Sequence, residues 1–324
     1  MMRIIYIDVD SLRPDHMGCY GYIRNTTPHI DRIAKKGMRF DSCYISSSPC
    51  VPSRASFISG RFAINHGAMT HWGPGSEYYY PVDDVHSREF PFLSRYLRNA
   101  GYRTVTFSNF ADRHMSWWFL AGWEETHTPT LKSGAIDADE VNQAVIPWLK
   151  QHGTEENYFL HIQYWDPHTF YTYPRSFFEQ WNDSPVKEFP SQQDIERHQQ
   201  DSFFRSAKYL HQNNDYTELM PEKIENRSDL KHLIDGYDGG ISYMDYHIGE
   251  LLKVLNDLGI EDEVCFIISA DHGESMGEQG IYMDHMNATE SVHRVPLIMT
   301  IPGVTPPGQN VDGFVYNVDV RSPI

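Results

Sequence analysis

The sequence has few cysteines and no long hydrophobic run. Only four of its 324 residues are cysteine, and no two of them have the Cys-x-x-Cys spacing of a structural zinc site. Four thiols in a chain of this size provide no disulfide framework either. The most apolar stretches, such as residues 295–299, are far too short to span a bilayer. We therefore expect neither a disulfide-stapled fold nor a membrane protein.

Basic residues are scarce relative to acidic ones. The chain has 27 Lys and Arg against 44 Asp and Glu, which gives a formal net charge of −17. This charge disfavours nucleic acid and anionic membrane surfaces as partners. The N-terminal residues contain no cleavable apolar leader and are typical of a first strand. As written, the sequence predicts a cytoplasmic protein, or a periplasmic or secreted one if its N-terminus is trimmed.

Apolar runs typical of strands alternate with helical patterns along the chain. Each predicted strand is followed by polar residues; the strands cover residues 4–9, 158–165 and 264–270. Helical spacing of apolar residues predicts helices at 27–37, 90–101, 139–152 and about 233–258. This alternation predicts an α/β fold with a large, mostly parallel sheet and helices on both faces. Ligands of such sheets bind at the carboxyl ends of the strands, where the polar residues lie.

Two segments depart from this pattern. Residues 170–227 are polar with little periodicity, and we interpret them as an inserted lid or substrate loop, with an irregular surface excursion as the alternative. Residues 314–316 are typical of a strand. Ser322 and Pro323 are typical of a helix start, yet the sequence stops at Ile324. The sequence therefore looks like a fragment of a longer protein.

The most specific motif is CVPSRASFISGR at residues 50–61. Cysteine followed by Pro52, Arg54 and a closing Ser-Gly-Arg resembles the signature of type I sulfatases, whereas an isolated cysteine would be interpreted as a buried thiol. The resemblance implies that a formylglycine-generating enzyme or an anaerobic sulfatase-maturating enzyme oxidises Cys50 to formylglycine, and that Arg54 stabilises the hydrated aldehyde. The hydrate carries two hydroxyls on one carbon, so one can attack sulfur while the other later expels sulfate.

Two strand ends carry candidate metal ligands. Asp10 lies in VDSLRPD (9–15), and Asp271 and His272 lie in SADHGE (269–274); both motifs resemble metal elements of that family. Carboxylates with an imidazole suit one divalent cation, calcium by the family resemblance, with Mg²⁺ or Mn²⁺ as alternatives. Many family members have a second Asp where this chain has Ser11. Asp8, on the same strand face as Asp10, is the candidate to replace it.

Three histidines are candidates for proton transfer and sulfate contact. His285 stands where an ungapped match of ESVHRVPL (290–297) to the family's EExxRVPL places a lysine of the family. His168, in Asp-Pro-His, resembles a substrate-side histidine of the family. His114 follows Arg113 in the region where many members have Gly-Lys-Trp-His, and this match is the weakest. The alternative for each histidine is a structural role.

These motifs, together with TPHIDRIAKKGMRF (27–40), occur in the family's order over most of the chain. The resemblance implies an alkaline-phosphatase-like α/β sandwich and a sulfatase catalytic domain over residues 1–324, with the lid at 170–227 and without the family's C-terminal subdomain. The implied reaction is hydrolysis of a sulfate ester of a carbohydrate or a small aryl or alkyl alcohol. Two alternatives stay open: a phosphonate monoester hydrolase or phosphodiesterase of the same superfamily, and a truncated, inactive sulfatase-like binding protein.

Overall fold

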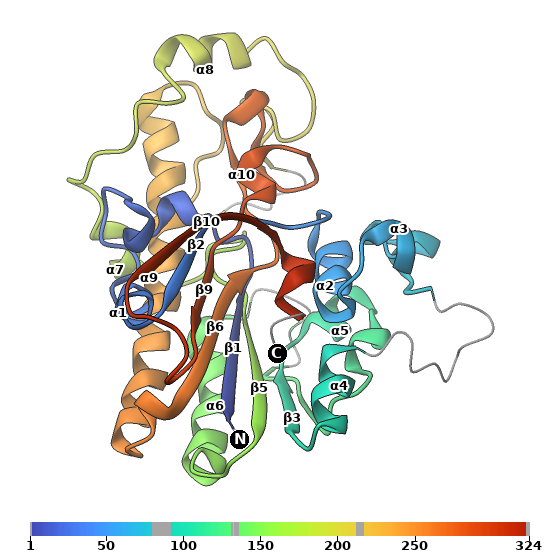
Figure 1. Cartoon of the computed structure of the whole chain (residues 1–324). Coiled ribbons are helices and arrows are strands. Elements are labelled where there is room, and N and C mark those ends of the chain that lie inside the picture. Colours follow the sequence, from blue (N-terminus) through green and yellow to red (C-terminus); the bar gives the residue numbers. More distant parts are fainter. Residues whose placement is uncertain (1, 80–91, 131, 133–135, 212–216, 322–324) are drawn as a thin grey trace.

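A computed structural model describes residues 2–79, 92–130, 132, 136–211 and 217–321. Its centre is an eight-stranded sheet (Figure 1). The strands are, in spatial order, β10 (Gln309–Tyr316), β2 (Met38–Tyr44), β9 (Leu297–Thr300), β6 (Val264–Ala270), β1 (Arg3–Val9), β5 (Tyr158–Tyr164), β3 (Arg103–Phe107) and β4 (Glu125–His127). Among these eight, β9 runs against the others, pairing antiparallel with β2 and β6. The predicted mostly parallel sheet is confirmed.

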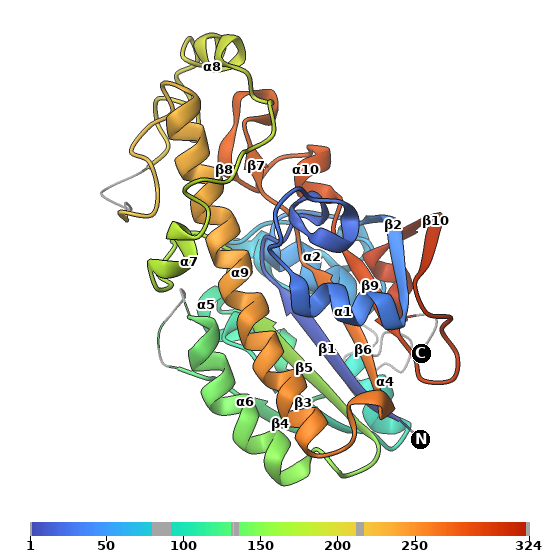
Figure 2. The same cartoon turned by 90° about the vertical axis from the view of Figure 1, so that its left-hand side faces the viewer.

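Helices cover both faces of the sheet (Figures 1 and 2). One face carries α1 (Pro28–Lys36), α6 (Ala138–His152) and α9 (Arg227–Asp257), which cross in front of the strands in Figure 2. The other face carries α2 (Cys50–Ser59), α3 (Ala63–His66), α4 (Leu93–Asn99) and α5 (Phe110–His114). Every residue of β5 and β6 is buried, as expected for central strands covered on both sides.

The register of the three central strands sets the position of their polar ends. Val9 of β1 pairs with Tyr164 of β5 on one side and with Ala270 of β6 on the other. The residues that follow each strand therefore leave the sheet at the same level. Asp10 is held there by its backbone N–H, which donates to the Tyr164 carbonyl at 3.0 Å. The three predicted strands at 4–9, 158–165 and 264–270 are confirmed as β1, β5 and β6.

The predicted helices are found with small changes in their bounds. Helix α1 has Pro28 in its first turn and ends at Gly37, where a Cβ would lie 2.3 Å from the Met299 carbonyl oxygen. Helix α9 begins at Arg227, before the expected start near 233. Its first turn is polar, and the start is fixed by the Asn226 side chain, which accepts from two backbone N–H groups. The predicted helix at 90–101 is α4, and residues 90 and 91 lie outside the described residues.

The polar segment after β5 is folded against helix α9. It contains α7 (Ser176–Glu179) and α8 (Gln192–His198), and the Tyr173 hydroxyl donates to the Gly236 carbonyl of α9. It also contacts β8 (Tyr282–Asp284), which pairs with β7 (Ser275–Met276): the backbone N–H of Tyr282 donates to the Arg205 carbonyl at 2.8 Å. Helix α8 and the β7–β8 pair lie in the upper part of Figure 2. The described residues of 170–227 therefore pack against α9 and β8, although most of them lie outside helices and strands, and their role as a lid stays a prediction.

The predicted strand at 314–316 is the end of β10, whereas Ser322 and Pro323 lie outside the described residues. None of the helices in the described ranges has both the length and the apolar character needed to cross a bilayer.

Candidate functional site

Two acidic strand ends meet beside the first turn of helix α2. Asp271 follows β6, and its Oδ1 accepts the backbone N–H groups of Ser11 at 3.3 Å and His272 at 2.9 Å. Asp10 follows β1 and is fully buried, as is His272. His272 Nε2 lies 3.6 Å from Asp10 Oδ1 and 3.4 Å from Asp271 Oδ2. The chain thus places two carboxylates and one imidazole around a single buried point.

Cys50 is the first residue of α2 and points at the same place. Its Sγ lies 3.1 Å from His272 Nε2, and the Ser53 hydroxyl fixes the helix by donating to the Asp271 carbonyl at 2.5 Å. Burial, followed by the charges of Asp10 and Asp271, raises the pKa of the thiol well above its ordinary value. The thiol is therefore protonated at neutral pH and is a poor nucleophile in this form.

Arg54 lies one helical turn beyond Cys50 and contacts three carboxylates. Its Nε donates to Asp8 Oδ2 at 2.8 Å, and its Nη1 donates to Asp10 Oδ2 at 3.2 Å and to Asp271 Oδ2 at 2.5 Å. Asp8 has a second partner, His161 Nε2, at 3.3 Å. Arg54 is 3 % exposed, so these ion pairs are shielded from water. The guanidinium cation compensates the acidic group and orients its oxygens.

The donor atoms in this group suit a divalent cation. One ligand atom from each of Asp10, Cys50, Asp271 and His272 lies within 4.8 Å of the others. Burial disfavours the charged form of both carboxyls. For Asp10, the charges of Arg54 and nearby imidazoles outweigh burial and hold its pKa below the ordinary value. For Asp271, burial and the neighbouring acids dominate and raise its pKa. Burial lowers the pKa of His272 to about 3, so its imidazole is a neutral donor. Asp8 lies outside this four-residue group and is occupied by Arg54 and His161.

His168 and His285 lie beside His272 and extend the site. Their ring centroids are 5.0 Å apart, and the His285 ring stacks on His272 at 4.2 Å. Burial lowers the pKa of His168 well below its ordinary value. Burial also acts to lower the pKa of His285, but the Glu274 carboxylate, 3.5 Å from Nδ1, reverses the effect and raises it. The pair therefore combines a neutral imidazole with one that favours its charged form.

His114 lies farther from the centre, against a histidine that the sequence did not single out. Its ring centroid is 4.8 Å from that of His71, which in turn is 6.2 Å from His285. Burial lowers the pKa of His114 to about 3 and that of His71 to about 2. The adjacent Arg113 places its guanidinium 3.5 Å from the centre of the Trp165 ring. His71 lies in a loop without helical or strand periodicity, so no sequence signal pointed to it.

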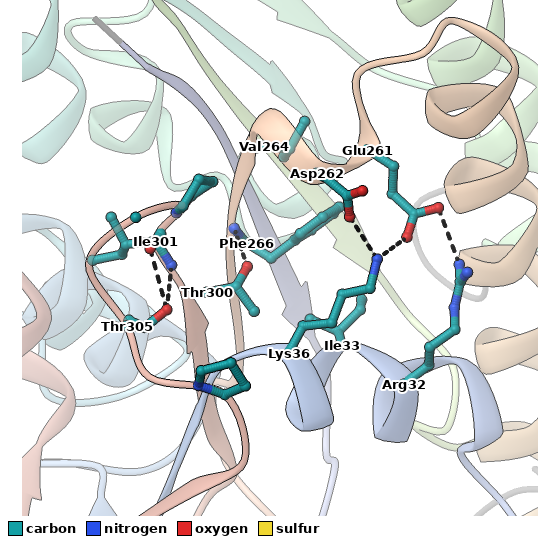
Figure 3. A pocket seen from close by; sticks show the side chains of 13 residues that line it. Arg32, Ile33, Lys36, Glu261, Asp262, Val264, Phe266, Thr300, Ile301 and Thr305 are labelled. Atoms are coloured by element: carbon teal, nitrogen blue, oxygen red, sulfur yellow. Dashed lines mark hydrogen bonds and ion pairs between the residues drawn. The ribbon is translucent and has the colours of Figure 1, made fainter.

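The opposite end of the sheet offers a pocket of different character (Figure 3). A cavity of about 220 Å³ lies between α1, the start of β6 and the loop after β9. Its charged residues form ion pairs with one another: Lys36 Nζ lies 2.8 Å from both Glu261 and Asp262. The residues that line it include no cysteine or histidine. The chemistry therefore concentrates at the carboxyl ends of β1 and β6.

Comparison with known proteins identifies the family and the fold of this chain. The profile of the family described as "Sulfatase" matches residues 3–322. Mouse (Mus musculus) iduronate 2-sulfatase is 25 % identical over 94 % of this chain and 60 % of its own length. A solved structure of a protein in complex with its substrate D-glucosamine-2-N,6-O-disulfate has a TM-score of 0.74 at 18 % identity, and covers 99 % of this chain and 75 % of that chain. The phosphonate monoester hydrolase of Agrobacterium radiobacter also has a TM-score of 0.74, at 20 % identity, over 99 % of this chain and 72 % of its own.

The two structural likenesses establish the fold, which is the alkaline-phosphatase-like sandwich expected from the sequence. The chain spans about 60 % of the length of the first curated relatives that it matches. The family profile, in contrast, extends over nearly the whole sequence. The chain belongs to the sulfatase family.

Proposed function

We propose that this chain is the catalytic part of a sulfuric ester hydrolase that uses formylglycine formed from Cys50. The observation that carries the proposal is the position of residue 50. It lies at the buried start of α2, within 3.1 Å of an imidazole that borders two carboxylates. A nucleophile there would have a cation-binding group on one side and proton-carrying imidazoles on the other.

Asp10, Asp271 and His272 would hold one divalent cation. The cation would act as a Lewis acid that reduces the charge on the sulfuryl oxygens. Calcium follows from the family resemblance, and Mg²⁺ and Mn²⁺ are the alternatives. Asp8 contributes indirectly in this arrangement, since it fixes Arg54, which orients Asp10 and Asp271. Formylglycine at position 50 would supply, as its hydrate, one hydroxyl for attack on sulfur and a second for release of sulfate.

The surroundings of each histidine give it a different role in proton transfer. His168 donates its Nδ1–H to the Thr169 carbonyl at 2.5 Å, so Nε2 carries the free lone pair and can accept a proton. His285 is paired with Glu274 and favours its charged form. It can donate a hydrogen bond to a sulfate oxygen or a proton to the departing alcohol. His114 lies one ring farther out and would act on the substrate through His71.

An anionic substrate needs local positive charge in a protein with a net charge of −17. Because Arg54 is paired with three carboxylates, the bound divalent cation, Arg113 and His285 would supply this charge around Cys50. We propose a sulfated saccharide or small aryl or alkyl sulfate as substrate, and a formylglycine-generating or anaerobic sulfatase-maturating enzyme as the partner that modifies Cys50. The segment at 170–227 borders β8 next to His285, which supports its proposed role as a substrate lid.

The test joins mass spectrometry to kinetics. The protein is co-expressed with a converting enzyme, the mass of the peptide containing residue 50 is measured, and hydrolysis of para-nitrophenyl sulfate is compared with that of para-nitrophenyl phenylphosphonate. We expect formylglycine at position 50, faster sulfate turnover, and loss of turnover in Cys50→Ala but not in the matched Cys19→Ser control. A thiol at position 50 with activity intact would refute the mechanism. A strong preference for the phosphonate would favour the phosphonate hydrolase, and no turnover by fully converted, metal-loaded protein would favour a binding protein.

A further inference from the structure

We propose that the unconverted protein, with a thiol at residue 50, binds one Zn²⁺ ion through Cys50, His168 and His285. This site shares Cys50 with the carboxylate group of the proposed hydrolase but takes its other ligands from two histidines outside that group. It requires no sulfatase activity, and it concerns the form of the chain that precedes formylglycine.

The three side chains already form a compact, buried group. One ligand atom from each lies within 4.8 Å of the other two, and all three residues are buried. Zinc with one sulfur ligand at about 2.3 Å and nitrogen ligands at about 2.0–2.1 Å separates its donor atoms by about 3.5 Å in tetrahedral geometry. Small rotations of the side chains would therefore close this group around the ion without moving the backbone.

Hydrogen bonds hold both histidines in the tautomer that a metal requires. His168 Nδ1 is bonded to the Thr169 carbonyl at 2.5 Å, and His285 Nδ1 is in contact with Glu274 Oε2 at 3.5 Å. With Nδ1–H engaged, the neutral form of each ring carries its lone pair on Nε2. An imidazole whose other nitrogen donates to a carbonyl or a carboxylate is the usual outer arrangement of a zinc site. The second oxygen of Glu274, Oε1, is buried without a hydrogen-bond partner among the described residues and can strengthen this contact.

The chemistry of the donors separates this group from the carboxylate group next to it. Asp10 and Asp271 offer hard oxygen ligands, which suit Ca²⁺ or Mg²⁺. Cys50, His168 and His285 offer one sulfur and two nitrogens, which suit Zn²⁺, with water as a fourth ligand. Because position 50 borders both groups, the atom present there decides which kind of ion is favoured.

Zinc binding would change the state of the thiol. Burial keeps Cys50 protonated in the free protein, so binding forms a zinc–sulfur bond and releases the thiol proton to solvent, together with the Nε2 proton wherever His285 is in its charged form. The sulfur is then engaged by the metal and shielded. The unconverted protein would therefore carry a Zn²⁺ ion at the position of the nucleophile. Replacement of the sulfur by an oxygen-bearing side chain would lower the affinity for Zn²⁺.

Cobalt provides a direct probe of the ligands. The whole chain is expressed without a converting enzyme, the thiol at residue 50 is verified by mass, and the metal-free protein is titrated with Co²⁺ and then with competing Zn²⁺. We expect a thiolate-to-cobalt charge-transfer band in the near ultraviolet, intense visible bands of a tetrahedral ion, and displacement of both by one equivalent of Zn²⁺. Absence of a charge-transfer band would overturn the proposal.

Variants distinguish this site from the carboxylate group, which also includes Cys50. Removal of one ligand from a zinc site weakens binding by about 100-fold or more, so Cys50→Ser, His168→Ala and His285→Ala should each lose Zn²⁺ affinity to that degree. Asp271→Asn, which removes no ligand of the proposed zinc site, should keep it, as should the thiol control Cys19→Ser. The reverse pattern, with loss in Asp271→Asn and retention in His168→Ala, would overturn the proposal.

A measurement on the unaltered sequence guards against misfolded variants. X-ray absorption of the zinc-loaded chain should show one sulfur neighbour at about 2.3 Å and nitrogen neighbours at about 2.0–2.1 Å. A zinc shell composed only of oxygen and nitrogen would refute the site. Sulfate ester hydrolysis is not measured in any of these experiments, so failure of the zinc site leaves the proposed hydrolase untouched.

Discussion

Replacement of Arg54 tests whether its guanidinium cation holds the acidic strand ends together. Arg54→Met keeps the length of the side chain and removes the charge that Asp8, Asp10 and Asp271 share. Loss of one partner from a buried ion pair costs about 3–5 kcal/mol. Some hydrogen bonds would survive, such as that from the Ser11 backbone N–H to Asp271. We therefore expect the free energy of unfolding to fall by an amount within that range, and not by the sum of three separate ion pairs.

The loss can be measured as a shift of the thermal midpoint. The entropy of unfolding is roughly 0.7 kcal/mol/K for a chain of this length, so Arg54→Met should unfold about 4–7 °C below the unaltered protein near pH 8. The matched control is Arg113→Met, whose guanidinium packs on Trp165 and which should shift the midpoint by about 1–3 °C.

The dependence of the thermal midpoint on pH and on Ca²⁺ identifies the cause of the lost stability. The deficit of Arg54→Met should shrink as the pH falls toward 4, because uncompensated carboxylates become protonated. Added Ca²⁺ should raise the midpoint of Arg54→Met more than that of the unaltered protein, because the cation substitutes for the missing charge. A midpoint equal to that of the unaltered protein, or a deficit that neither pH nor Ca²⁺ changes, would refute the reasoning.

Three further predictions concern single side chains. His66 is buried, accepts the Ala68 backbone N–H at Nδ1 and lies 3.0 Å from the Ser56 hydroxyl; burial lowers its pKa to about 4. In the unfolded chain the pKa of this histidine is about 6.5. Between pH 6.5 and 4 the unfolded chain therefore binds a proton that the folded chain does not, so stability falls as the pH is lowered through this range. In denaturant titrations, His66→Gln should abolish this fall of about 3 kcal/mol, and an unchanged pH slope would contradict the assignment. Asp271→Asn should weaken Ca²⁺ binding by about 100-fold in calorimetry, whereas the exposed control Asp257→Asn should not; equal affinities would exclude Asp271 as a ligand. In pH profiles of kcat/KM, Glu274→Gln should move the alkaline limb to lower pH because it removes the charge that raises the pKa of His285, and His285→Lys should move it to higher pH. Identical profiles would show that the charge of His285 is not needed.

The local sequence was sufficient for the elements and for much of the candidate site. Continuous apolar runs predicted the buried strands β1, β5 and β6, because a strand covered on both faces has no polar side. The residues directly after these strands carry the candidate chemistry, and parallel strands end at the same edge. Asp10, His168, Asp271 and His272 could therefore be assigned to one place from the sequence, and the motif at 50–61 added Cys50 and Arg54.

Other features depend on contacts between distant segments. The start of α9 was missed because its first turn is polar and is fixed by the Asn226 cap rather than by apolar periodicity. His71 was missed because a loop histidine carries no periodic signal, and it reaches the site only by packing against His114. Asp8 shares a strand face with Asp10, but its contacts with Arg54 and His161 come from a helix and a neighbouring strand.

The family, the strand ends and the candidate site residues could be predicted from the sequence, because each is encoded in residues close together along the chain. The donor atoms that surround Cys50, and the charge that each histidine favours, follow instead from the tertiary fold. Cys50 and His272 are 222 positions apart in sequence and 3.1 Å apart in space. The physical reason is that burial and the nearest charges set a pKa or a ligand set, and both are properties of the folded chain.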